Sequence, residues 1–169
     1  MKKLLLVLLI VVAIIGSIGV YLWTNDVIYF SGKDVDGIYV EEELRIATDR
    51  NHGFSYCKLI KKAIGDDQED IKKLMLLDFS GAGAAGYDHG DVLVKLIDRL
   101  GEKTIISSLG SQLTEEERRE IEDYIAVGLE YGSNPHQGQN PEEAFPLLYE
   151  YLQKETPPVS STDVNNLNN

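Results

Sequence analysis

Residues 77–91, LDFSGAGAAGYDHGD, decide between two fold classes. Their glycines have the G-x-G-x-x-G spacing of a loop that binds dinucleotide phosphates, and such a loop must follow a strand and open a helix. The preceding LMLL instead continues an amphipathic pattern that begins at DDQEDIKK, and the next apolar run, TIISS, carries no acid to hold a ribose. The stretch therefore predicts a connector between two helices, with no nucleotide and no other cofactor.

Amphipathic segments with helix start and stop signals surround this connector. Apolar residues recur at spacings of three and four, and capping residues or glycines mark the ends of the segments. Helices are predicted to begin near Tyr56, after Asp66 or Asp67, at Asp88, at Glu102, after Thr114 and at Pro141. Because the links are short, consecutive helices should be antiparallel neighbours. The predicted fold is mainly all-α, with a compact bundle or a helical-hairpin array over residues 54–155.

Three positions make these helix ends specific. Thr114 and Glu117 form the pattern of a capping box, in which each side chain bonds the backbone N–H of the other. Gly65 is placed to end the helix before it, as a residue in the left-handed conformation. Proline is disfavoured in a helix interior, so either Pro146 occupies the first turn of the last helix, or this helix starts later than Pro141.

The segments on either side of the helical domain are harder to assign. Residues 24–53 form a lead-in, in which VIYF and IYV on either side of SGKDVDG fit a short β-hairpin over residues 27–40. The following EEELRIATDR fits both a strand period of two and a helix period of 3.6, and both alternatives stay open. The polar residues 156–169 predict a disordered tail.

An uncharged run, residues 4–23, follows Lys2 and Lys3 at the start of the sequence. As a helix it would be about 30 Å long, which is the thickness of the hydrocarbon core of a bilayer. We expect residues 1–23 to be either a single-pass membrane anchor or a signal segment cleaved near Ser17. In the first case the rest of the chain lies outside the cytoplasm at the cell membrane. In the second it is secreted or periplasmic.

The charge of the chain limits its partners. There are 28 acidic and 16 basic side chains, and the formal net charge is −12. A strongly acidic domain is repelled by the phosphates of nucleic acids, so no nucleic acid is expected to bind. A protein partner with a basic surface is compatible with this charge, and so is a merely soluble surface.

The end of the glycine-rich stretch, YDHGD, contains the residues best placed to form a metal or acid–base site. Asp88, His89 and Asp91 offer donor atoms for a metal, if a site exists. A structural alternative explains both acids, with Asp88 as the N-cap of the next helix and Asp91 as its N3 partner. The single cysteine, Cys57, can form no intramolecular disulfide and reads as a small buried residue.

The sequence favours a binding protein over an enzyme. No catalytic residue, cofactor site or metal site is indicated with any specificity. We therefore expect a membrane-anchored or exported, small, acidic, helical protein that acts by protein–protein binding, such as an envelope adaptor or an immunity-type inhibitor. The alternative is an envelope metal-binding protein or enzyme that uses the loop containing Asp88, His89 and Asp91.

Overall fold

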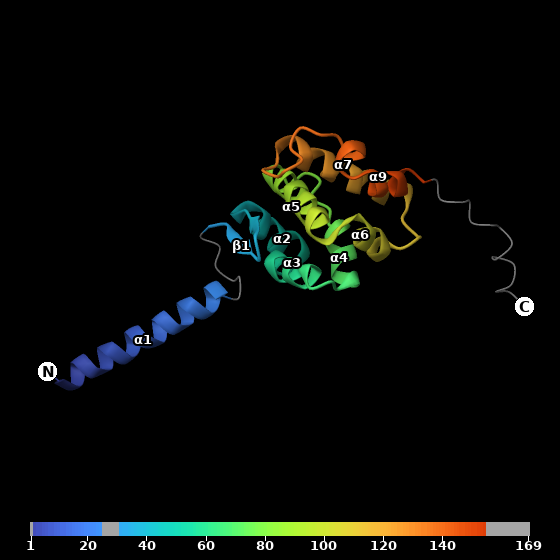
Figure 1. The fold of residues 1–169 in the computed structure, drawn as a ribbon. Helices are drawn as coiled ribbons and strands as arrows, with labels where there is room; N and C mark the ends of the chain where they lie inside the picture. Colours follow the sequence, from blue (N-terminus) through green and yellow to red (C-terminus); the bar gives the residue numbers. More distant parts are fainter. Residues whose placement is uncertain (1, 25–30, 155–169) are drawn as a thin grey trace, which may run out of the picture.

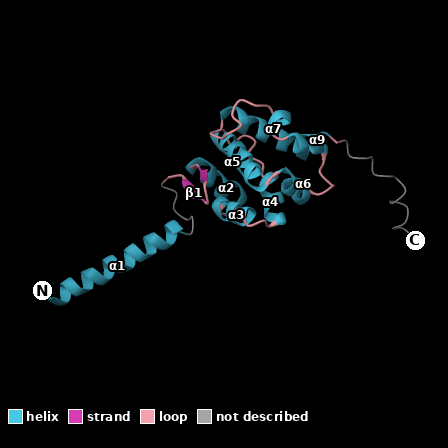
Figure 2. Ribbon diagram, viewed as in Figure 1, coloured by secondary structure: helices cyan, strands magenta, loops and turns pink. Residues whose placement is uncertain are grey.

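The computed structural model describes residues 2–24 and 31–154 and is mainly helical, with one small antiparallel sheet (Figures 1 and 2). The predicted all-α character is thereby confirmed. In chain order the elements are α1 (Lys2–Thr24), β1 (Lys33–Val35), β2 (Ile38–Val40), α2 (Glu42–His52), α3 (Tyr56–Ile64), α4 (Gln68–Met75), α5 (Ala84–Leu100), α6 (Glu102–Leu109), α7 (Glu115–Tyr131), α8 (Pro141–Ala144) and α9 (Pro146–Gln153).

Helix α1 contains the uncharged run and extends away from the other helices (Figure 1). Every side chain from Leu8 to Tyr21 is exposed. Among the residues that the structure describes, no helix is both long enough and apolar enough to cross a membrane, so the predicted transmembrane span is not supported here. The strand predicted at VIYF and the predicted tail lie outside the described residues.

The β-hairpin is shorter than the sequence predicts. Its second strand is the predicted IYV, but its first strand is Lys33–Val35, inside the segment expected to be the turn. Only Asp36 and Gly37 connect the strands, with φ values of 51° and 89°. Two positive φ values are the signature of the tight turn that Asp-Gly sequences favour. The prediction placed the first strand too early because it read this Asp-Gly pair as part of a longer loop.

Helix α2 settles the assignment that the sequence left open. Leu44 and Thr48 are buried four residues apart, which is the spacing of a helix face. Asp67, one of the two predicted caps, accepts hydrogen bonds from the first-turn amides of α4. Gly65 ends α3 as predicted, but its φ is −75°, and Asp66 takes the left-handed conformation instead, with φ 65°.

Helix α5 begins at Ala84, one turn before the predicted start at Asp88. Gly83 is its N-cap, with φ 59°, and Asp88 lies within the helix. The predicted capping roles of Asp88 and Asp91 are therefore wrong. Gly86 led to the misplaced start, because glycine is costly inside a helix unless packing requires it. As predicted, the glycine-rich residues before Ala84 connect two helices, and LMLL is not a strand.

The later helices follow their predicted signals. Thr114 and Glu117 form the capping box at the start of α7, with hydrogen bonds in both directions. The last segment is divided at Phe145 into the short α8 and α9, and Pro146 is the first residue of α9. This confirms the alternative in which the last helix starts later than its apolar pattern.

The buried side chains form one hydrophobic core around α5. This helix contacts β2, α2 and α3, which precede it in the sequence, and α6 and α7, which follow it. Its most extensive contact is with α7, where Gly90 lies directly against Gly128. A Cβ at Gly90 would overlap the carbonyl oxygen of Tyr124 and lie 2.9 Å from the amide nitrogen of Gly128. Only glycine permits so close an approach of two helix backbones.

Candidate functional site

The three residues singled out from the sequence point in different directions from α5. Asp88 and Asp91 are three residues apart and share one face of the helix, whereas His89 is rotated by about 100° from Asp88. The two aspartates are partly exposed, and His89 has 0% exposure in the core. The structure therefore separates the predicted set into a surface pair and a buried histidine.

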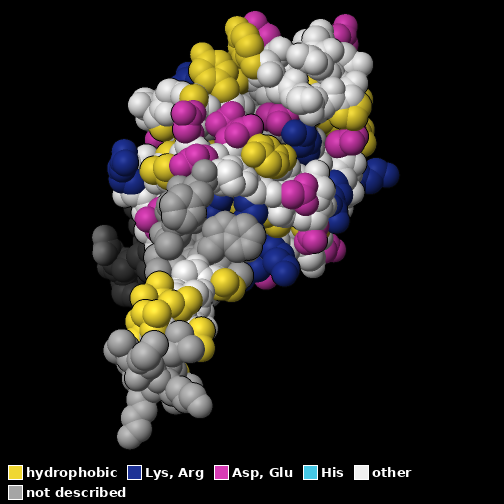
Figure 3. Space-filling view, turned by 90° about the vertical axis from the view of Figure 1, so that its left-hand side faces the viewer, with side chains coloured by type: hydrophobic (Ala, Val, Ile, Leu, Met, Phe, Trp, Pro, Cys, Tyr) yellow, Lys and Arg dark blue, Asp and Glu magenta, His cyan; other side chains and the backbone are white. Residues whose placement is uncertain are grey.

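Asp88 and Asp91 line a surface cleft of about 370 Å³, which we call the tyrosine–carboxylate cleft. Its walls come from β2, from the segment after it, from α5 and from the C-terminal end of α7. The side chains that define it are three tyrosines, three carboxylates and one lysine: Tyr39, Tyr87, Tyr131, Glu41, Asp88, Asp91 and Lys95. Figure 3, in which the left-hand side of Figure 1 faces the viewer, shows acidic side chains close to hydrophobic ones on this face.

The tyrosines form the exposed rim of the cleft. Tyr87 and Tyr131 are 51% and 61% exposed, and their rings meet edge to face with centroids 5.3 Å apart. Tyr39 is 46% exposed and comes from the hairpin. Exposed tyrosines are rigid, have a negative ring face and can attract a cation. The cleft thus combines aromatic faces with carboxylates.

The carboxylates of the cleft are incompletely neutralised. Lys95 pairs with Asp91 at 2.6 Å, and Asn134 also approaches Asp91 at 3.4 Å. Within the described part of the chain, Asp88 forms no ion pair. Burial raises the pKa of Asp88 to about 6, and the negative charges of Glu41, Glu43 and Asp91 add to this rise. A cation that entered the cleft would relieve this repulsion.

His89 lies in an aromatic enclosure formed by Tyr56, Phe79 and Tyr124. The centroids of these three rings are 5.8, 4.8 and 5.0 Å from the His89 ring. Nδ1 is 2.6 Å from the Tyr56 hydroxyl, while Nε2 has no hydrogen-bond partner among the described residues. Burial lowers the pKa of His89 to about 3, with a further contribution from His52. His89 is therefore a neutral core residue at physiological pH.

The structure does not bring the candidate metal ligands Asp88, His89 and Asp91 together, because His89 is buried and the two aspartates are partly exposed. No group of three or more His, Cys, Asp or Glu side chains in residues 2–24 and 31–154 is arranged to hold a metal ion. His52 is close enough to His89 to affect its pKa, and the centroids of the His52 and Phe79 rings are 5.5 Å apart. His136 is elsewhere, 3.2 Å from the Asp98 carboxylate.

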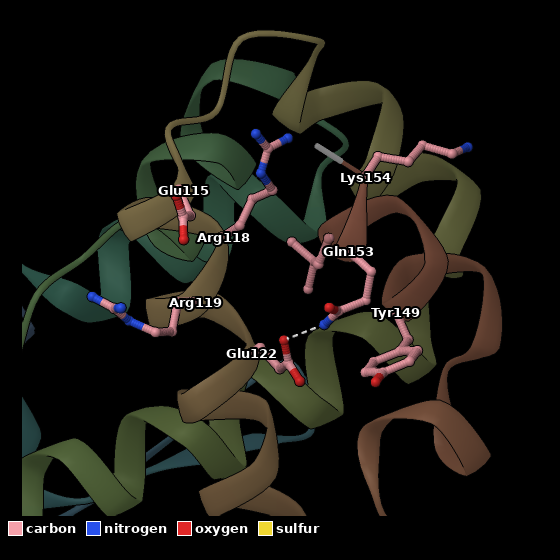
Figure 4. A pocket seen from close by; sticks show the side chains of 8 residues that line it. Glu115, Arg118, Arg119, Glu122, Tyr149, Gln153 and Lys154 are labelled. Atoms are coloured by element: carbon pink, nitrogen blue, oxygen red, sulfur yellow. Dashed lines mark hydrogen bonds between the residues drawn. The ribbon is translucent and has the colours of Figure 1, made fainter. Parts of the chain in front are cut away.

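A larger hollow of about 640 Å³ lies between α7 and α9 (Figure 4). Two acidic and three basic side chains line it, and two of its polar groups already bond to each other. Gln153 donates to the Glu122 carboxylate at 2.6 Å across the hollow. Lys154 pairs with Glu150 at 3.4 Å. This hollow offers less unbalanced charge than the cleft, so we place the candidate site at the smaller one.

The three tyrosines of the cleft were not predicted from the sequence. Tyr39 and Tyr131 are far from Asp88 in the sequence, and only the tertiary fold brings them together. Tyr87 and Lys95 carried a local signal. Once α5 is known to start at Ala84, Tyr87, Asp91 and Lys95 follow at spacings of four. The misplaced helix start hid this pattern.

Comparison with known proteins adds no relative. No protein-family model, no curated protein and no solved structure matches this chain.

Proposed function

We propose that this protein acts by binding a protein partner, and that a lysine or arginine side chain of that partner enters the tyrosine–carboxylate cleft. The observation that carries the proposal is the Asp88 carboxyl beside exposed tyrosines, which forms no ion pair within the described residues and whose pKa is raised to about 6. A cation in this place gains from the carboxylates and from the rings of Tyr87 and Tyr131 at once. An adaptor or an immunity-type inhibitor of a basic protein is the class of function that this supports.

The place of action is also a proposal. The uncharged run after Lys2 and Lys3 supports export of residue 24 onward, or attachment to a membrane outside the cytoplasm. A reporter that is active only outside the cytoplasm, fused to the C-terminus, should be active. A silent fusion, together with an active cytoplasmic reporter at the same position, would refute the export of the domain.

The binding proposal can be tested with residues 31–169 and a short oligo-lysine peptide as the probe, titrated by calorimetry at low ionic strength. Tyr131→Ala should weaken binding by about 1 kcal/mol, roughly fivefold, because it removes one cation–π face. Asp88→Asn should weaken peptide binding more than Tyr131→Ala does, because it removes a negative charge.

Two control variants separate the cleft from the overall negative charge. Glu122→Gln removes the same charge as Asp88→Asn from the hollow between α7 and α9, and Tyr149→Ala removes a tyrosine from that hollow. Both should leave the peptide affinity within about twofold, since neither lines the cleft. If the cleft variants and the control variants weaken binding equally, the peptide reads net charge alone and the proposal is wrong.

A further inference from the structure

The glycine loop, residues 77–83, is attached to the core around His89. The ring of Phe79 is buried against His89, and the Phe79 amide donates a hydrogen bond to the Tyr124 hydroxyl at 2.6 Å. The Asp78 carbonyl lies 3.2 Å from Nε2 of His52. Each of these attachments therefore ends on His89 or on a side chain that surrounds it.

The enclosure of His89 has no place for a positive charge. The titratable groups that face it are His52 from α2, Tyr56 from α3 and Tyr124 from α7. The Asp78 carboxylate lies on the outer side of Tyr124, 3.5 Å from its hydroxyl, and Asp88 is on another face of α5. No carboxylate is among the groups that act on the His89 ring. A protonated ring would have to reach water instead.

The three rings of the enclosure differ in how easily they can move. Tyr56 and Tyr124 belong to helices α3 and α7 of the core. Phe79 belongs to the glycine loop, which also contains Gly81 and Gly83, with φ values of 79° and 59°. Within the loop, the backbone bond from the Ala82 amide to the Phe79 carbonyl is local and can move with it. Water can therefore reach His89 at the lowest cost by displacement of Phe79.

We propose that Phe79 is an acid-sensitive latch, which releases the glycine loop from the core when His89 takes up a proton. In the closed loop the imidazole is neutral and shielded. In the open loop it is hydrated and can be charged. Each proton bound only by the open form lowers the ratio of closed to open loop by up to tenfold for each pH unit below the ordinary pKa of histidine.

Hydrogen exchange of the folded protein, corrected for intrinsic exchange rates, tests the latch. We expect the Phe79 amide to be less protected than the Ile125 amide in α7 at every pH. Its protection should fall by about tenfold per unit from pH 6 to pH 4, because only the open form takes up a proton at the ordinary pKa of histidine. The fall should disappear in His89→Gln and persist in His136→Gln, a histidine outside the enclosure.

Two results would overturn the latch. If the Phe79 and Ile125 amides have equal protection at each pH, the loop opens only when the whole domain unfolds. If the loop is less protected but its exchange does not depend on pH, His89 is not the trigger. Both results are obtained on the wild-type protein, so the test does not depend on the folding of His89→Gln. Phe79→Leu adds a further check, since it should release the loop at neutral pH.

Discussion

The two faces of α5 shift the pKa values of two adjacent residues in opposite directions. Asp88, on the outer face, has its pKa raised to about 6 by partial burial and by neighbouring carboxylates. His89, on the inner face, has its pKa lowered to about 3 by full burial. Both environments favour the neutral form, but only the outer one can be relieved by a ligand. The inner face therefore supplies packing and stability, and the outer face supplies charge for binding.

The largest expected effect is on the inner face, at the contact between α5 and α7. Gly90→Ala should destabilise the domain by about 3 kcal/mol, because the added methyl meets backbone atoms that cannot move aside. Gly86→Ala on the same helix is the matched control. Its methyl would find neighbours at 3.8 Å, so it should be neutral or should stabilise by up to about 1 kcal/mol. Urea unfolding of both variants measures the difference, and equal effects would show that the two backbones are not in close contact.

The next effect is the pH dependence that His89 confers. Since its pKa is lowered in the folded state, its contribution to stability is present above its ordinary value of 6.5 and is lost as the pH falls toward 3. The free energy of unfolding should decrease by up to about 1.4 kcal/mol per pH unit in this window. His89→Gln should flatten the profile between pH 6.5 and 4.5. An unchanged slope in this variant would mean that another group carries the titration.

The smallest effect belongs to the outer face and has the opposite sign. The folded-state pKa of Asp88 is raised, so its contribution to stability is present below its ordinary value of 3.8 and is lost as the pH rises through about 6. Asp88→Asn should therefore stabilise the domain slightly at pH 8, by about 0.5 kcal/mol, because the site is partly exposed. The variant should match the wild type at pH 4. Destabilisation at pH 8 would instead reveal a favourable partner of the carboxylate.

Local signals accounted for most of the helical framework. The capping box at Thr114, the cap at Asp67 and the glycine at the end of α5 were read from adjacent residues, and the structure contains all three. Residue spacing alone could not assign α2, because strand and helix periods coincide over so short a segment. The start of α5 was misplaced because Gly86, which lies inside the helix, resembles a loop residue in the sequence. The role of Gly90 in the contact with α7 depends on Gly128, which is distant in the sequence.

The candidate site was half predictable for a similar reason. Asp88 and Asp91 attract attention as charged neighbours of a glycine-rich stretch, and both line the cleft. Their interpretation as helix caps failed once the helix began earlier. The rim depends on Tyr39 and Tyr131, which only the packing of the hairpin and of α7 against α5 brings close. The residue pattern within a single helix or strand cannot predict a contact between side chains of different elements.

The contact between Gly90 and Gly128 has a consequence for the evolution of this chain. Most packing defects can be repaired by a second substitution that makes a facing side chain smaller. Here the facing atoms belong to the backbone, which every residue possesses, so no second-site substitution can make room for a side chain. In diverged relatives these two glycines should change last, after the tyrosines of the cleft and the surface charges. Two glycines at this separation, each inside an amphipathic helix, would then mark distant members of the same lineage.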